Sequence, residues 1–443
     1  MKTKNIILSF LAVPALLVTG CVGDLDQYPH TELTSHDVYS SVDGYQSVIS
    51  GVYTAMLLNQ SSIDDEDTRQ NFTRCLLMFQ ECSTDLLDDV WLAGESMTDV
   101  NNQSWNAGDP WVGAIYYHIY NIVSMANEFI RNASDESISS FPEPDRTRIK
   151  AWRDEARGLR AIAYFWAMDL FPGIPFVTED DPVGSYIPET YTRAQVFSFL
   201  ESELQDIGGT LPQTSYGHVN RATAWTLLAR MYLNAERYIG EPRYDECIRY
   251  CDMVMGDGYS LESDYFKLFN ADNHLRSNEI IFTLATDATY TVAWGAGTYL
   301  VCATRFDNYD GMYEDFGVST YWNCLRARPQ LVDLFDTDGD RRAMFGDKDR
   351  RTFDTPDLSD DYYEIEGDAQ YKYRDRSKEI IGHDETTSGW LINKWTNVTD
   401  NGEVPSDTRV NGAETDFPVF RLADVYLMYA EAVLRGGNGS AST

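Results

Sequence analysis

Aromatic rings crowd one stretch of the chain, residues 294–322, in which glycines interrupt any regular pattern. The chemistry that such rings offer is a flat apolar face that can stack against an apolar face of a ligand. Glycines relax the backbone, and loops of this length inside a compact domain are usually functional, so we expect a loop that displays its rings. The rings are Trp294, Tyr299, Tyr309, Tyr313, Tyr321 and Trp322, and the glycines are Gly295, Gly297, Gly311 and Gly317.

A second concentration of polar and aromatic side chains lies between Phe72 and Trp105, where no clear period is seen. We interpret its acidic residues as a solvated loop in preference to a site, because acidic residues occur throughout this chain. Trp91 is a better candidate for ligand contact, since its surroundings, DDVWLAGE, do not look like core. The other members of the group are Arg74, Glu81, Asp85, Asp88 and Asp89.

The charge balance argues against one class of partner. The chain has 70 Asp plus Glu against 35 Lys plus Arg, which gives a formal net charge of -35. Phosphate binding needs clustered positive charge, so no nucleic acid is expected as a partner. An acidic, well-hydrated surface suits a neutral or cationic ligand.

Motifs for catalysis or metal binding are sparse. The six histidines are scattered, and no G-x-S-x-G or H-E-x-x-H motif is present. Carboxylate pairs, which a glycoside hydrolase would need, are expected by chance among so many acids. Asp336, Asp338 and Asp340 resemble the start of a calcium loop, yet Gly339 stands at the fourth position where an EF-hand has glycine at the sixth. We therefore expect no enzyme and no cofactor, and leave calcium open.

The first twenty residues have the features of a secretion signal. Lys2 and Lys4 precede an apolar run over residues 6–18, which is too short to span a bilayer. Small residues directly before Cys21 resemble the bacterial lipoprotein cleavage motif. We expect residues 1–20 to be removed and Cys21 to be lipidated, which would anchor the protein to a membrane without spanning it.

Helical periodicity dominates the elements that must position the rings. Apolar residues in steps of three and four predict a helix from Ile149 to Leu170, which Pro172 ends. Residues 222–238 carry the W-x2-L-small-x2-Y signature of a tetratricopeptide helix, and paired helices of this kind stack into a solenoid. The last predicted helix has no partner further along the chain, so we expect the chain to stop short of its natural end. Further helices are predicted over 45–56, 111–130, 192–207, 244–255, 329–335 and 417–434, and a strand over 279–284.

Four segments together resemble the RagB/SusD family, the SusD-like outer-membrane lipoproteins of Bacteroidetes. They are Cys21 followed by DLDQYP, RGLRAIAYFWAMDLFPGIPFV at 157–177, the stretch 217–273 that begins GHVNRATAWTLLARMYL, and PVFRLADVYLMYAEA at 418–432. The resemblance covers the whole mature chain, residues 21–443. It implies a mostly α, SusD-like fold, in which a tetratricopeptide-like helical scaffold supports an irregular, loop-rich ligand-binding half with short strands. It also implies no catalysis: glycan is bound and handed to a SusC-like TonB-dependent transporter.

Resemblance to the starch-binding founding member of the family also implies a site. In that member an arc of three rings follows the curve of an α-glucan, with an arginine nearby. A ring laid against the apolar face of a pyranose removes apolar area from water, and an arginine donates to hydroxyls. We therefore expect starch or malto-oligosaccharide as the ligand of a surface-exposed, lipid-anchored protein of the outer membrane. The matching motifs place Trp91, Trp294 and Trp322 on the arc and Arg74 as the arginine, with Glu95, Tyr299 and Tyr321 as secondary candidates.

Some positions depart from that founding member. Trp294 stands where it has a Tyr, and its glucose-binding asparagine falls near Gly94 or Glu95 here. Residues matching a family calcium site include Asp272 and Glu279, but the ligand set is not preserved, and the family's basic C-terminal segment is absent from this sequence. Two alternatives follow: the same role for a different glycan, or a tetratricopeptide interaction scaffold that binds no glycan and buries its rings.

Overall fold

The structure is a computed structural model of the 443-residue chain. It describes residues 35–66, 69–91, 94–213, 215–292, 294–305, 312–322, 324–336, 339–345 and 389–440. The chain divides into two units, residues 1–45 and residues 46–443. The described part of the first unit contains α2 (Ser35–Val38) and the start of α3 (Val42–Ala55). The predicted signal peptide and Cys21 lie outside the described residues.

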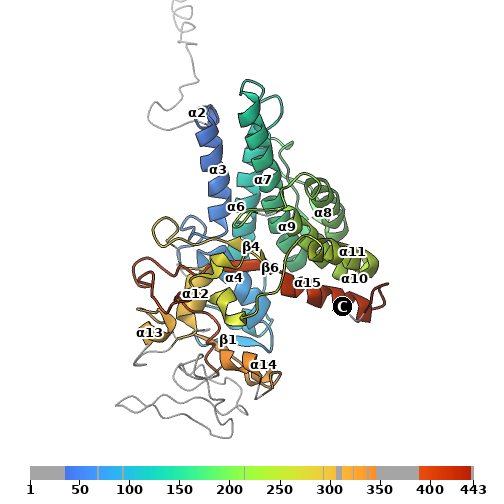
Figure 1. The fold of residues 1–443 in the computed structure, drawn as a ribbon. Helices are drawn as coiled ribbons and strands as arrows, with labels where there is room; N and C mark the ends of the chain where they lie inside the picture. Colours follow the sequence, from blue (N-terminus) through green and yellow to red (C-terminus); the bar gives the residue numbers. More distant parts are fainter. Residues whose placement is uncertain are drawn as a thin grey trace, which may run out of the picture. The chain divides into compact units, whose positions relative to one another are not determined.

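Antiparallel helices stacked side by side form one half of the second unit. Helices α6 and α7 make a hairpin, α8 packs on α7, α9 packs on α8 and α11 packs on α9 (Figure 1). Helix α15, near the end of the chain, returns to pack on α11 and α9, so the last predicted helix finds its partners earlier in the chain. The bounds are α6 Pro110–Asn132, α7 Glu143–Leu170, α8 Arg193–Ile207, α9 Arg221–Leu233, α10 Ala235–Ile239, α11 Tyr244–Met255 and α15 Leu422–Leu434.

Local capping explains where these helices begin. The side chain of Asp109 accepts hydrogen bonds from the first amides of α6, and Pro110 follows at a position that needs no N–H donor. Thr192 and Gln195 form a reciprocal capping box at the start of α8. Helix α7 begins at Glu143, before the predicted Ile149, because its first turn is acidic and compensates the positive end of the helix dipole. The predicted helical scaffold is thus confirmed.

Three short antiparallel strand pairs occur in the described part of this unit. The pairs are β1 (Leu87–Asp89) with β5 (Leu325–Ala327), β2 (Gly173–Pro175) with β3 (Thr190–Thr192), and β4 (Ile280–Leu284) with β6 (Phe417–Arg421). The predicted strand at 279–284 is confirmed as β4, but the helix predicted over 417–434 was wrong in its first five residues. Those residues instead pair with β4, and the pairing brings Phe420 against Phe282 in the core.

The segment 294–322 is not a continuous loop, and that expectation was wrong. Residues Ala296–Ala303 form helix α12, in which every residue is buried, and Met312–Phe316 form α13. The apolar run AGTYLVCA favours burial, and Gly297 permits it: a Cβ there would lie 1.8 Å from the carbonyl oxygen of Thr415. This glycine therefore serves close packing and not loop flexibility. Gly311 and Tyr309 lie outside the described residues.

Short elements complete the irregular half around α12. The helix predicted over 329–335 is shorter than expected, Pro329–Val332 (α14). Among the described residues, no helix combines the length and apolar character that a membrane span requires. The other short elements are α4 (Phe72–Leu77), the single-turn π-helix η2 (Met78–Cys82), α5 (Thr98–Asn101), and the 3₁₀ turns η3 (Tyr265–Phe269), η4 (Asn273–Leu275) and η5 (Asp340–Met344).

Candidate functional site

Helix α12 holds two of the predicted ring positions, one at each of its ends. Trp294 precedes its first turn, and the backbone N–H of Trp322 donates to the carbonyl of Cys302 in its last turn, at 3.0 Å. The two indoles lie 6.5 Å apart between ring centroids, with their planes inclined by 61°. Trp294 is 36% exposed and Trp322 is partly exposed. Residues that are distant in sequence thus form one aromatic surface.

Polar side chains of α4 fix the start of α12 and with it the backbone next to Trp294. The Thr73 hydroxyl accepts a hydrogen bond from the Ala296 N–H at 2.9 Å and donates its own proton to Asn71 Oδ1. Asn71 lies so close to Gly295 that a Cβ there would come within 1.9 Å of its side chain. Ala296 has a φ of +47°, a left-handed conformation that an L-residue adopts at a cost. The geometry at this turn is therefore strongly constrained.

A buried tyrosine supports the exposed indoles. The ring of Tyr299 lies 5.8 Å from that of Trp322, with 35° between the planes, and Tyr299 is only 1% exposed. Its hydroxyl donates to Asp89 Oδ2 at 2.9 Å, while Asp89 Oδ1 accepts the backbone N–H of Trp91, also at 2.9 Å. Burial, followed by the nearby Asp89 charge, raises the pKa of Tyr299 well above its ordinary value, so the phenol stays protonated and remains a donor.

The third predicted ring is tied to the other two through that carboxylate. Asp89 connects the backbone of Trp91 to Tyr299, and Tyr299 packs under Trp322. Trp91 itself is partly exposed. The structure therefore brings residues near 90 next to the segment 294–322, as the predicted site requires.

Arg74 does not lie at the surface, as its predicted role as a donor to sugar hydroxyls would require. It is 7% exposed, and its Nη2 contacts both carboxylate oxygens of Glu95, at 2.7 and 2.8 Å. The guanidinium carbon lies 4.4 Å from the ring centroid of Tyr299 and 5.9 Å from that of Trp111. Burial lowers the pKa of Arg74, but the neighbouring Tyr299, Glu95 and Asp89 raise it by more, so the cation persists.

The predicted residues therefore divide into two groups. Trp91, Trp294, Trp322 and the 39% exposed Tyr321 are accessible. Arg74, Glu95 and Tyr299 are buried beneath them and can support a ligand surface without touching the ligand. The burial of these three argues against direct contact with a glycan, and which residues contact it stays a prediction.

Sequence reasoning missed the polar groups that do the positioning. The acids near residue 88 were interpreted as a solvated loop, yet Asp88 and Asp89 are 1% and 0% exposed, in strand β1. Asn71 and Thr73 were not singled out at all. A signal existed for Asp89, because it stands two residues before an unusual tryptophan in a segment with no clear period.

The residues considered for calcium have protein partners. Asp272 accepts the backbone N–H of Asp400, and Glu279 pairs with Arg421 at 2.6 Å while accepting the N–H of Glu262. Within the described ranges no group of three or more His, Cys, Asp or Glu side chains could hold a metal ion. Asp338, in the other acidic run considered, lies outside these ranges.

Comparisons with known proteins agree with this architecture. A family model described as "SusD family" matches residues 278–442, and one described as "Starch-binding associating with outer membrane" matches residues 25–233. The starch-binding protein SusD of Bacteroides thetaiotaomicron is 27% identical over 99% of this chain and 82% of its own length.

Solved structures share the fold. The surface glycan-binding protein A of Bacteroides thetaiotaomicron, in complex with laminarihexaose, aligns with a TM-score of 0.65 and 17% identity over 90% of this chain and 80% of its own. A laminarin-binding SusD-like protein aligns with a TM-score of 0.65 and 20% identity, over 90% of this chain and 81% of its own. The two family matches cover separate parts of the chain, and the similarity to SusD extends over nearly all of it, which leads to one conclusion: the chain belongs to the SusD-like (RagB/SusD) family of non-catalytic carbohydrate-binding proteins.

Proposed function

We propose that Trp91, Trp294 and Trp322 form a surface that binds starch or malto-oligosaccharides. The observation that carries the proposal is the 61° inclination between the indoles of Trp294 and Trp322 at a centroid distance of 6.5 Å. Two rings inclined in this way cannot both lie flat against a straight, ribbon-like glycan. Successive sugar rings of a curved α-glucan present their apolar faces at changing angles, which suits such a pair.

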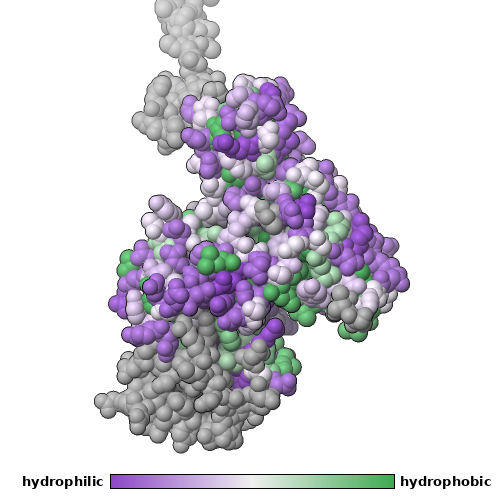
Figure 2. Space-filling view, viewed as in Figure 1, coloured by the Kyte–Doolittle hydropathy of each residue, from purple (hydrophilic) through white to green (hydrophobic). Residues whose placement is uncertain are grey.

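Charge supports a neutral polysaccharide as the ligand. The net charge of -35 repels acidic glycans, whereas an uncharged glucan is indifferent to it. The only described cation among the predicted site residues, Arg74, is already paired with Glu95. Figure 2 shows a largely hydrophilic surface with separate apolar patches, which suits a hydrated, hydroxyl-rich ligand.

A laminarin-type β-glucan is the second candidate ligand. Two relatives with the same fold are a laminarihexaose complex and a laminarin-binding protein. Their low identity gives no reason to transfer the ligand itself, so we treat this glycan as an alternative that the binding experiment decides.

Family membership also supports a proposal for the cellular role. We propose that Cys21 carries a lipid that anchors the chain to the outer membrane at the cell surface, and that bound oligosaccharide passes to a SusC-like TonB-dependent transporter. The signal pattern before Cys21 and a family description that names association with the outer membrane support this role. Palmitate labelling of the full-length chain, compared with the Cys21→Ala variant, tests the anchor, and co-purification with the transporter tests the partnership.

Isothermal titration with maltoheptaose, laminarihexaose and cellohexaose tests the ligand. We expect maltoheptaose to bind, and Trp322→Ala to weaken binding by about 2 kcal/mol, or about 30-fold, as expected for a central aromatic contact. Tyr290→Ala, at an 83% exposed tyrosine outside the proposed surface, is the matched control. Binding of laminarihexaose alone would refute the starch assignment, and binding of none of the three would refute the proposed site.

A further inference from the structure

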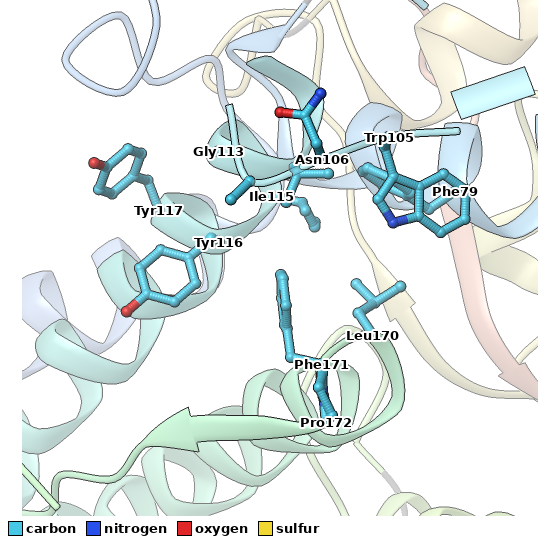
Figure 3. A pocket seen from close by; sticks show the side chains of 12 residues that line it. Phe79, Trp105, Asn106, Gly113, Ile115, Tyr116, Tyr117, Leu170, Phe171 and Pro172 are labelled. Atoms are coloured by element: carbon cyan, nitrogen blue, oxygen red, sulfur yellow. The ribbon is translucent and has the colours of Figure 1, made fainter. Parts of the chain in front are cut away.

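A second aromatic cavity lies outside the surface just described. It has a volume of about 540 Å³ and sits where the start of α6 meets the end of α7. Figure 3 shows Phe79 and Trp105 on one side of it, Tyr116 and Tyr117 on the other, and Phe171 with Pro172 between them. The volume falls within the range of about 300–1,000 Å³ typical of small-ligand sites.

Paired rings form the walls of this cavity. Trp105 meets Phe79 at 6.1 Å between centroids, and Tyr116 meets Phe171 at 5.8 Å, each pair at a right angle or nearly so. These contacts hold the rings in place, and Trp105 is nevertheless 43% exposed. Exposed tryptophan that is fixed by its neighbours can stack on a ligand at little cost in side-chain entropy.

Among the described residues that line the cavity, none carries a charged side chain. Its polar groups include the indole Nε1–H of Trp105 and the amide of Asn106, whose Oδ1 accepts the Gly108 N–H at 2.8 Å, whereas the hydroxyls of Tyr116 and Tyr117 point away from the other lining side chains (Figure 3). An ionic ligand would find no counter-charge here, and the net charge of -35 further disfavours an anion. The chemistry fits a neutral ligand with apolar faces and hydroxyl edges.

We propose that this cavity is a second glycan subsite, which takes one or two neutral hexopyranose units of the same polysaccharide. The inference rests on the proposed function, because it assumes that this chain meets glycan at all. Sugar C–H faces would stack on Trp105, and sugar hydroxyls would meet its indole N–H and the Asn106 amide.

Shared elements connect the subsite to the first surface. The indole of Trp111 donates to the Glu95 carbonyl at 2.8 Å, beneath the first surface, while the next two residues of α6, Val112 and Gly113, line the cavity. On the other side, Phe79 belongs to η2, which continues directly from the α4 helix that carries Arg74. Two weak sites on one rigid frame would give a polymer a higher avidity than either site alone.

Gly113 offers a way to close the cavity without removing a native contact. A Cβ at this position would meet no atom within 4 Å, so a larger side chain has open space to enter. Gly113→Phe should fill the cavity, and Gly113→Ala is the matched control that leaves most of it open. Trp105→Ala removes a wall by an independent route.

The experiment uses the full chain with the first surface disabled. We expect the Trp294→Ala/Trp322→Ala variant to retain weak binding of maltoheptaose in ligand-observed saturation-transfer spectra. Adding Gly113→Phe or Trp105→Ala should reduce this residual signal at least threefold, whereas adding Gly113→Ala should not. In the otherwise unchanged chain, Gly113→Phe should lower retention in a starch affinity gel and leave the effect of Trp322→Ala intact.

Three outcomes would overturn the subsite. The first is loss of all residual binding in the double tryptophan variant, and the second is residual binding that survives both cavity variants. The third concerns binding of an apolar dye to the same variants. If Gly113→Phe abolishes dye binding but leaves the glycan signal unchanged, the cavity takes an apolar partner and not a glycan. Failure of the proposed function is distinct, because the unmodified chain would then bind no glycan in the titrations described above.

Discussion

The buried ion pair under the aromatic surface gives the most discriminating perturbation, Arg74→Met. Arg74 and Glu95 are each 8% exposed in their side chains, and the pair is joined at 2.7 Å. Removing the guanidinium takes a positive charge away from the Glu95 carboxylate and from the nearby buried Asp89. Breaking a buried pair from one side costs about 3–5 kcal/mol of unfolding free energy, and we expect Arg74→Met to fall in that range.

The variant of the other partner, Glu95→Gln, should lower the unfolding free energy by less than Arg74→Met does. Glu95→Gln keeps the shape of the side chain and leaves Arg74 with Asp89 as its remaining counter-charge. We therefore expect a loss of about 1.5–3 kcal/mol, the value for a hydrogen bond to a charged group. The double variant Arg74→Met/Glu95→Leu should recover most of the stability lost by Arg74→Met, but not all, since Asp89 stays buried without a cation.

Chemical denaturation of the four proteins, followed by tryptophan fluorescence and circular dichroism, measures these stabilities. Isothermal titration with the glycan that the unmodified chain binds then tests the role of Arg74 in the site. If Arg74 only supports Tyr299 and the indole of Trp322, the folded double variant should bind within about threefold of the parent, a change below 1 kcal/mol. A stable double variant that binds tenfold more weakly would show that Arg74 contacts sugar directly and would refute this division of roles.

Three further perturbations test the frame. The hydrogen bond that His218 Nδ1 donates to Glu155 raises the pKa of His218, so the stability from this pair is present below about pH 6.5 and is lost as pH rises through the raised value. In the His218→Asn variant the denaturation midpoint should therefore depend less on pH between pH 6 and pH 8. Gly297→Ala should lower both thermal stability and glycan affinity, because its Cβ would lie 1.8 Å from the Thr415 carbonyl oxygen and displace α12; unchanged stability would contradict the close approach. Thr192→Ala should cost about 0.5–2 kcal/mol by removing the capping box of α8 and leave affinity unchanged, which titration checks.

Local pattern predicts much of the helical half, because each helix there has its own period and its own stop signal. Helix α11 was predicted over the bounds that the structure gives, and α6 and α8 to within a few residues. The irregular half could not be derived in this way. Helix α12 is buried on every side, so its sequence carries no amphipathic period, and β6 forms only because β4 lies beside it.

The candidate site was only partly predictable, for a related reason. Trp294 and Trp322 stand out by residue type, but their mutual approach depends on α12, and the link to Trp91 passes through Asp89. Apart from its position two residues before Trp91, nothing in this acidic sequence marks Asp89 as buried. The family resemblance pointed to Arg74, but it did not show that the Arg74 guanidinium is already hydrogen-bonded to Glu95.

The separation between an accessible aromatic surface and a buried polar support has a consequence for ligand specificity. The backbone beside Trp294 is held by the Thr73 hydroxyl and by the close fit of Gly295 against Asn71, neither of which involves the indole. A change of ring at residue 294 therefore alters the width and hydrogen-bonding edge of the platform without disturbing the turn that presents it. Trp294→Tyr should fold as stably as the parent and change the ratio of affinities for maltoheptaose and laminarihexaose, and titration with both glycans measures that ratio. A large loss of stability in this variant would mean that the indole itself holds the turn, and specificity would then be coupled to folding at this position.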